Sequence, residues 1–417
     1  MQAIGSTPLP NDQDAQLRQR AAKVVPGGMT GHLNAASLPP GYPQFFERGQ
    51  GCRVWDADGN AFIDFMCSWG PNLLGHHHPA VDAAARRQQE LGDCLNGPTP
   101  RFVELAERFV ARSAHADWAL FQKNGTDATT VCLMIARAAT GKRKVLVATK
   151  AYHGADPWCT PIAVGVTAED RAHLIHYTYN DVASLEAAVA QAGDDLAAIV
   201  CAAFKHDLGV DQQLPTREFA QRARALCTQA GAALILDEVR AGYRVHGGGT
   251  WETVGVRPDL SAWSKAIANG YALAAVTGVD ALRDAATRIY STGSFWSGGV
   301  AMAAGLATLE VAESADLVGH LQRVGQRFRD GIAAQAASYG VPVRQSGPAA
   351  LPLILFDDDA GFDKGFVFTG EALRRGVYLH PKHNMFLSLA HTEQDIDQAL
   401  QATDAAFAVV AQRFGRH

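Results

Sequence analysis

The sequence predicts an α/β fold built around a large, mostly parallel sheet. Short apolar runs recur between stretches with helical periodicity, and this alternation is typical of crossover units in which helices join parallel strands. The chain has 417 residues, more than one hydrophobic core usually holds, so a second, smaller domain is expected. No internal repeat or low-complexity segment points to a repeat architecture instead.

The first part of the chain is predicted to form a helix and then a hairpin. The first thirty residues are polar and helix-like, and they end at Pro26-Gly27-Gly28. Two short alternating segments, 53–55 and 61–65, flank the turn Asp56-Ala57-Asp58-Gly59, which is the pattern of a hairpin.

The central part supplies the strands of the expected sheet. The apolar runs lie at residues 118–121, 145–148, 197–200 and 232–236, and a weaker strand pattern follows at 260–263. Runs of this length separated by helices indicate strands buried on both faces. After about residue 300, an alanine-rich helical region leads to a smaller α+β tail with a strand candidate at 351–356.

Composition and charge exclude several classes of protein. With 37 basic and 42 acidic residues, the formal charge is -5, and no stripe of Lys and Arg suggests nucleic acid as the main partner. No apolar stretch approaches the length of a membrane span. The N-terminal segment contains acidic residues and no apolar core, which argues against a secretory or transit peptide and favours the cytoplasm.

The seven cysteines are predicted to be reduced. Their number is odd, their spacing is scattered and no C-x-x-C motif occurs. Six of them lie among apolar or small neighbours and are predicted to be buried structural thiols. Cys159, in the loop PWCTP, is predicted to be the one that is not buried.

Chemistry is expected where the strands end, because ligands of open α/β sheets bind beyond the carboxyl ends of the strands. Four segments follow predicted strands, and we expect them to converge on one rim. They are residues 122–126, 152–154, 237–239 and 264–265.

Two charged residues of these segments have both a catalytic and a structural interpretation. Lys265 is framed by small and apolar residues, which would lower its pKa and leave a nucleophilic amine, although a surface lysine with its stem on the core fits as well. Asp237 closes a buried strand, so it either pairs with a cation, such as a protonated pyridine nitrogen, or caps the next turn.

A phosphate site is predicted at Asn124-Gly125-Thr126. This turn of small residues leads into a helix, whose free N–H groups and dipole favour an anion, although an ordinary helix cap is the alternative. No Walker motif is present. Tyr152 can stack on a flat cofactor ring or fill the core. We predict no metal site at 76–78, because adjacent histidines point in different directions, and no Gly-x-Ser-x-Gly motif supports a serine nucleophile.

Taken together and in order, these segments resemble the class III aminotransferases of fold type I, and the branch they resemble is that of glutamate-1-semialdehyde 2,1-aminomutase. The resemblance runs from about residue 20 to residue 410 and rests on order and spacing as well as residue identity. The matching segments are 24–28, 68–71, 74–79, 124–129, 152–154, 237–239, 242–244, 264–265, 301–305 and 388–391.

The resemblance implies a pyridoxal-phosphate enzyme with a large cofactor domain and a smaller α+β domain built from both termini. The implied division is 1–70, 71–300 and 301–417. Lys265 would form a Schiff base with the cofactor and move protons, and Asp237 would pair with its pyridine nitrogen. The other implied cofactor contacts are Asn124, Gly125, Thr126, Tyr152, His153 and Val239.

The resemblance also implies a homodimer with active sites at the subunit interface. In this family a hydroxyl from the neighbouring subunit reaches the cofactor phosphate. Ser294 stands where threonine is usual, and Thr292 is the alternative.

Three departures from the aminomutase pattern indicate a different substrate. Residues 29–34 contain no arginine, so the bidentate carboxylate contact of that branch is missing. Ala202-Ala203 replaces the usual Glu-Pro pair, and 297–299 replaces Gly-Asn-Pro. The candidate substrate residues are His32, Trp69 and Arg240.

We therefore expect an aminotransferase that moves an amino group from an amine or amino acid to a keto acid or aldehyde. An intramolecular aminomutase or epimerase on the same scaffold is the alternative, and it would need no co-substrate. A cofactor-binding but catalytically silent homologue is the third possibility. The sequence does not identify the donor or the acceptor.

Overall fold

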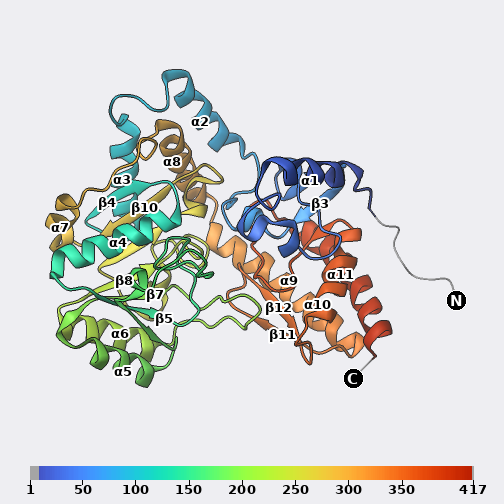
Figure 1. Ribbon diagram of the computed structural model, residues 1–417. Coiled ribbons are helices and arrows are strands. Elements are labelled where there is room, and N and C mark those ends of the chain that lie inside the picture. Colours follow the sequence, from blue (N-terminus) through green and yellow to red (C-terminus); the bar gives the residue numbers. More distant parts are fainter. Residues whose placement is uncertain (1–8, 416–417) are drawn as a thin grey trace.

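The structure is a computed structural model that describes residues 9–415 of the chain. Figure 1 shows two regions side by side: one is built on the large sheet, and the other combines the N-terminal segment with the C-terminal helices. The large sheet has the strand order β4-β10-β9-β8-β7-β5-β6. Its strands are β4 (Trp118–Gln122), β5 (Lys144–Ala148), β6 (Leu174–Tyr177), β7 (Leu196–Ala202), β8 (Ala233–Asp237), β9 (Leu260–Trp263) and β10 (Ala274–Gly278).

Five strands of this sheet are parallel neighbours, and β10 runs against both β4 and β9. Since β10 is antiparallel to both, β4 runs in the same direction as β9. The carboxyl ends of β4, β5, β7, β8 and β9 therefore meet at one edge of the sheet.

Helices cover both faces of the large sheet, which explains why its strands are apolar throughout. In β8, Ala233 and Ile235 pack with α4 (Gly125–Thr140), whereas Leu234 and Leu236 pack with α6 (Arg217–Ala230). Successive strand residues point to opposite faces, so both sets must be apolar. The other helices of this region are α2 (Pro79–Leu91), α3 (Pro100–Arg112), α5 (Val182–Ala192), α7 (Arg283–Arg288) and α8 (Gly299–Ser314).

The second region contains a four-stranded sheet of order β1-β2-β3-β13. Its strands are β1 (Phe46–Gln50), β2 (Arg53–Asp56), β3 (Ala61–Asp64) and β13 (Val377–Tyr378). Since β13 pairs with β3, segments from both ends of the chain share this sheet. The remaining elements are α1 (Asp12–Val24), β11 (Val343–Ser346), β12 (Leu353–Phe356), α9 (Leu317–Tyr339), α10 (Asp363–Arg374) and α11 (Glu393–Phe414).

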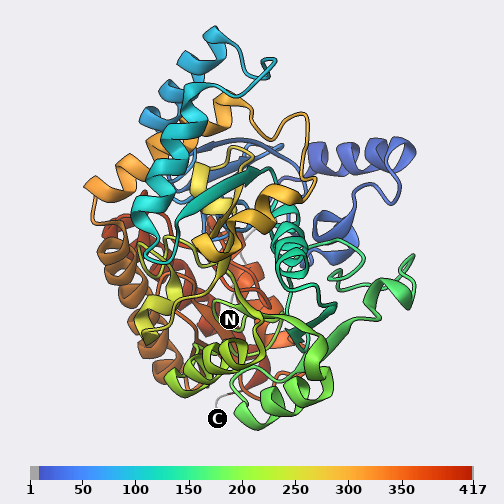
Figure 2. The ribbon, with the colours of Figure 1, turned by 90° about the vertical axis from the view of Figure 1, so that its left-hand side faces the viewer.

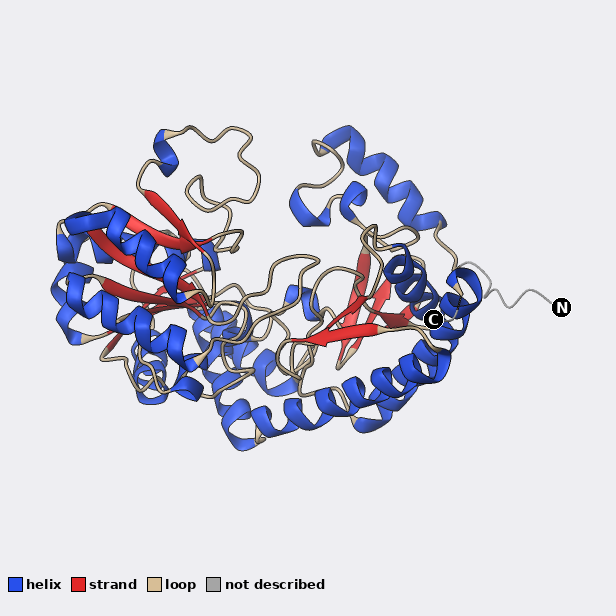
Figure 3. Cartoon of the chain, turned by 90° about the horizontal axis from the view of Figure 1, so that it is seen from below, coloured by secondary structure: helices blue, strands red, loops and turns tan. Residues whose placement is uncertain are grey.

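The two regions are distinct in the view from below. Figure 3 shows one group of strands at the left and another at the right, with helices around both. Viewed onto the large sheet, the α2–α3 part lies at one end and the α5–α6 part at the other (Figure 2). The division at residues 70 and 300 stays a prediction, and residues 1–8 and 416–417 of its outer parts lie outside the described chain. Helix α8 crosses the second boundary and packs on α2 and α3.

The predicted α/β fold is confirmed, and most predicted strands lie where the apolar runs indicated. The hairpin is β2–β3, and the C-terminal strand is β12. Strands β6 and β10 were not predicted. The burial predicted for Cys94 is wrong, because it is exposed after the end of α2; the other five of the six are buried, and Cys159 is half-buried. No helix within residues 9–415 is both long enough and apolar enough to span a bilayer.

Candidate functional site

The four segments predicted to converge do meet, in a cavity of about 430 Å³ at the carboxyl edge of the large sheet. The four segments meet at this edge because each follows β4, β5, β8 or β9, and these strands all end there. Residues of the N-terminal segment close the other side. The cavity is lined by His32, Leu33, Ser68, Trp69, Pro71, Lys123, Asn124, Gly125, Thr126, Tyr152, His153, Gly154, His206, Asp237, Val239, Arg240, Ser264, Lys265, Gly270, Tyr271, Ala272 and Leu273.

Lys265 is the first residue of the short 3₁₀ turn Lys265–Ala268, which follows β9. Its backbone adopts the left-handed conformation, with φ of 53°. The Nζ atom donates a hydrogen bond to the carbonyl oxygen of Trp69, at 2.8 Å. Burial, assisted by the nearby cations Arg240 and Arg244, lowers the pKa of Lys265 to about 7. The amine is therefore held in place, and near pH 7 about half of it is in the neutral form that a nucleophile needs.

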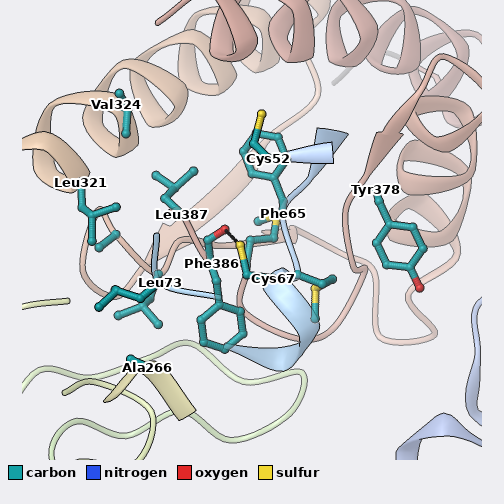
Figure 4. Close-up of a cluster of buried hydrophobic side chains, with 14 of the residues drawn as sticks. Cys52, Phe65, Cys67, Leu73, Ala266, Leu321, Val324, Tyr378, Phe386 and Leu387 are labelled. Atoms are coloured by element: carbon teal, nitrogen blue, oxygen red, sulfur yellow. Dashed lines mark hydrogen bonds between the residues drawn. The ribbon is translucent and has the colours of Figure 1, made fainter. Parts of the chain in front are cut away.

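The turn that accepts this hydrogen bond is itself strained. Cys67, Ser68 and Trp69 all have positive φ, and Gly70 follows with φ of 111°. A Cβ on Gly70 would lie 2.9 Å from the ring of Phe386, so the position needs glycine. Figure 4 shows Cys67 and Phe386 in the core, where the Cys67 Sγ donates to the Phe386 carbonyl at 3.4 Å. Packing from the C-terminal region thus holds an unfavourable backbone at the site.

Asp237 is the last residue of β8, and its carboxylate is buried at the base of the cavity. One oxygen lies 2.7 Å from Nδ1 of His153, and the other accepts the backbone N–H of Val239 at 3.0 Å. His153 is also buried, and its ring stacks on Trp158 with an interplanar angle of 13°. These contacts fix the direction of the carboxylate.

The predicted phosphate loop lies at the N-terminus of α4, with Asn124 as the residue before the helix. Asp127 closes the turn by accepting the Asn124 backbone N–H at 2.8 Å. A Cβ at Gly125 would lie 2.7 Å from a methyl group of Val239, so only glycine permits this approach. The first N–H groups of a helix have no partner within it, and the residues at the start of this helix, Gly125 and Thr126, line the cavity.

The three candidate substrate residues all line the same cavity. Trp69 is surrounded by imidazoles, with ring centroids at 4.6 Å from His32, 5.5 Å from His380 and 4.9 Å from His383. Burial lowers the pKa of His380 to about 4 and that of His383 well below its ordinary value. Both rings are therefore neutral hydrogen-bonding groups at physiological pH.

Arg240 is the charged member of this group. Its Nη1 donates to the side-chain oxygen of Asn384 at 2.5 Å, which joins the large sheet to the C-terminal region. Within residues 9–415, its other guanidinium nitrogens have no hydrogen-bond partner. The cation therefore keeps donors available to the cavity.

Ser294 is the one predicted site residue that does not line this cavity. It is exposed, in the segment between α7 and α8. Tyr152 lines the cavity and is 44% exposed, so one face of it remains open.

Sequence reasoning missed several residues that line the cavity. Lys123 lies within the predicted segment 122–126 but was given no role there, and His206 follows the end of β7, where the strand-end rule could have found it. Tyr271 lies beyond the turn after Lys265, and its sequence context carries no such signal. Within the described chain, no group of three or more His, Cys, Asp or Glu is arranged to bind a metal ion.

Comparisons with known proteins identify the family. The family model described as aminotransferase class III matches residues 38–407. An aminopentol aminotransferase from Sphingopyxis macrogoltabida is 47% identical over 95% of this chain and 94% of its own length. A glutamate-1-semialdehyde 2,1-aminomutase from Anaeromyxobacter sp. (strain Fw109-5) is 33% identical over 95% of this chain and 98% of its own.

Solved structures resemble the whole chain. The FumI protein of Sphingopyxis sp. MTA144, solved in its PLP internal aldimine form, superposes with a TM-score of 0.95 at 47% identity, covering 96% of this chain and 97% of its own. An omega-transaminase from Sphaerobacter thermophilus, with a TM-score of 0.85 at 24% identity over 98% of both chains, shares the fold.

Proposed function

Because the chain belongs to the class III aminotransferases and is a pyridoxal-phosphate-dependent aminotransferase, we propose that Lys265 holds the cofactor and that Asp237 faces the ring nitrogen. One observation carries this assignment. Lys265, Asp237 and the Asn124–Thr126 loop line a single cavity, so an amine, a carboxylate and an anion site face one space.

The residues that line the cavity suit pyridoxal phosphate. Gly125 lies close to Val239, which leaves the loop backbone open toward a phosphate, and Val239 and Tyr152 offer surfaces for the two faces of a flat ring. Asp237 is buried and oriented by His153, as a partner of a protonated pyridine nitrogen must be.

Pyridoxal phosphate supplies an electron sink for bonds at the substrate carbon next to the amino group. In the proposed mechanism, Lys265 Nζ would act as the acid–base group that moves the proton of the substrate carbon. The Trp69 carbonyl oxygen, which accepts a hydrogen bond from Nζ, would orient the amine. Asp237, held in place by His153, would face the ring nitrogen and favour its protonated form.

The active assembly is proposed to be a homodimer. Ser294 is exposed and lies outside the cavity of its own chain, as expected for a hydroxyl that reaches a neighbour's phosphate. Large apolar side chains are exposed on the same segment and on the nearby end of α2; they include Phe295 at 67% and Leu91 at 76%. Exposed apolar groups of this kind mark protein interfaces.

The donor is proposed to be an amine that carries hydroxyl groups and needs no carboxylate. His32 and Trp69 line the cavity and offer a hydrogen-bonding ring and an aromatic surface rather than charge, and the neutral His380 and His383 pack around Trp69. The aminopentol named for the 47% identical relative fits this class. Arg240, which keeps free donors, is proposed to bind the carboxylate of a keto acid acceptor.

A screen of amines and carbonyl compounds tests this function. A hydroxylated amine should bleach the visible absorbance band of the bound cofactor, and a keto acid added afterwards should restore it. Turnover of a single compound without a co-substrate would instead support the aminomutase alternative, which the relatives of that name keep open. If no amine changes the visible absorbance band, both the aminotransferase and the aminomutase functions are contradicted.

The pH dependence of cofactor attachment gives a first prediction. Below pH 7 the Lys265 amine is protonated and cannot attack an aldehyde. The rate at which the cofactor-free protein binds pyridoxal phosphate should therefore rise about tenfold per pH unit and level off above pH 7. In Arg240→Met, loss of a cation raises the lysine pKa, so the plateau should move to higher pH. Stopped-flow absorbance measures the rate against pH for the wild-type protein and for Arg240→Met. If the two curves superimpose, the assignment of Lys265 as the attachment site is contradicted.

A further inference from the structure

Lys123 is a second lysine in the cavity, and the mechanism does not use it. It lies between the end of β4 and Asn124, immediately before the phosphate loop. The side chain is half-buried. Within residues 9–415, its Nζ makes no hydrogen bond and no ion pair; the hydrogen bond that Lys123 makes is from its backbone N–H. An ammonium group in this position lacks the partner that such a group ordinarily has.

Asp93, the carboxylate that acts on the Lys123 amine, is already engaged. Asp93 accepts the backbone N–H of Val300 at 2.9 Å through its side chain, and its carbonyl oxygen accepts the N–H of Gly299 at 3.1 Å, so it caps the start of α8. Gly298 adjoins both groups, since a Cβ there would lie 2.9 Å from Asp93 Oδ1 and 3.4 Å from Lys123 Nζ. The amine thus lies between the start of α8 and the phosphate loop.

Burial lowers the pKa of Lys123, and the acidic Asp93 counteracts this only in part. A half-buried cation without a partner is unfavourable until an anion approaches it. A phosphate monoester carries close to two negative charges at neutral pH, and the N-terminus of α4 supplies neutral N–H donors but no full positive charge.

We propose that Lys123 Nζ binds the phosphate group of the cofactor, as the cation that completes the site formed by Asn124, Gly125 and Thr126. This rests on the proposed function, because it requires the cofactor to lie with its phosphate at the N-terminus of α4. The ammonium donates a charge-assisted hydrogen bond to a phosphate oxygen, and no covalent bond forms.

The test compares pyridoxal phosphate with pyridoxal, which lacks the phosphate. Lys123→Met keeps the length of the side chain and removes its charge. The dissociation constant of pyridoxal phosphate from the cofactor-free protein, measured by absorbance titration, should rise about tenfold, the effect of one hydrogen bond to a charged group. The constant for pyridoxal should not change. Lys123→Arg should bind pyridoxal phosphate nearly as wild type, and the loss in Lys123→Met should shrink at high salt.

A matched control removes one lysine charge elsewhere. Lys23 is exposed near the end of α1 and does not line the cavity, so Lys23→Met should leave both constants unchanged. Equal weakening of pyridoxal and pyridoxal phosphate in Lys123→Met would overturn the proposal and assign Lys123 a structural role. Unchanged binding of both would also overturn it. Failure of the wild-type protein to attach either compound would instead contradict the role of Lys265.

Discussion

Replacing Lys265 by alanine should abolish the visible absorbance band of the bound cofactor and lower kcat by at least about 10²- to 10⁴-fold, the range that one positioned acid–base group contributes. The amine is the group proposed to attach the cofactor and to carry the proton, so both functions are lost together. Since the Nζ hydrogen bond to Trp69 is a single contact, the fold should persist. Absorbance, steady-state kinetics and circular dichroism measure the three effects.

The other cavity lysine supplies the control for this experiment. Lys123→Ala removes a lysine from the same cavity, and at saturating cofactor it should keep the band. A Lys265→Ala protein that still shows the wild-type band, or a Lys123→Ala protein that loses it at saturation, would refute the assignment of the attachment site.

Replacing Asp237 by asparagine should lower kcat by about 10²- to 10⁴-fold. The change keeps the shape of the side chain and removes its charge, so a protonated ring nitrogen would lose its counter-ion. Breaking a buried charge pair costs about 3–5 kcal/mol, and each 1.36 kcal/mol corresponds to a factor of ten in rate. Because Asp237 also pairs with His153, the variant should hold the cofactor less firmly. Single-turnover kinetics at saturating cofactor separate the two effects.

Glu238 provides a neighbouring carboxylate for comparison. It is buried, but its oxygens accept hydrogen bonds from the Thr250 backbone N–H at 2.5 Å and the Thr250 hydroxyl at 2.6 Å, and it does not line the cavity. Glu238→Gln should lower the melting temperature while the folded enzyme keeps its kcat within a few-fold. If it lowers kcat as strongly as Asp237→Asn does, the specific role of Asp237 is wrong.

Local pattern predicted most of the large sheet but not all of it. The runs that became β5, β7 and β8 are apolar on both faces, a signal that helices on both sides impose. Strand β10 consists of small residues, Ala274 to Gly278, and β6 is a four-residue strand at the sheet edge that contains His176. Strand β10 lacks the bulky apolar residues by which strands are recognised. Strand β6 does contain Leu174, Ile175 and Tyr177, but it has only four residues and its His176 is exposed, so its apolar run is too short to stand out, and pairing with β5 defines it.

The site, too, has a part that the sequence predicts and a part that it does not. Lys265, Asp237 and the phosphate loop follow strands, and the direction of those strands brings them to one edge, so the order of elements sufficed to group them. His380, His383 and Asn384 reach the site from the C-terminal region, more than a hundred residues beyond Lys265 in the chain. No sequence period links such distant segments, because their contact depends on how the two regions pack.

Reduction of the purified enzyme with borohydride, followed by peptide mapping, tests the central claim most directly, because it fixes the cofactor to the nitrogen that holds it. We predict that the modified peptide contains Lys265 and that the phosphate-bearing label is absent from the peptide containing Lys123. A label on Lys123, on another lysine, or on no lysine at all would contradict the account.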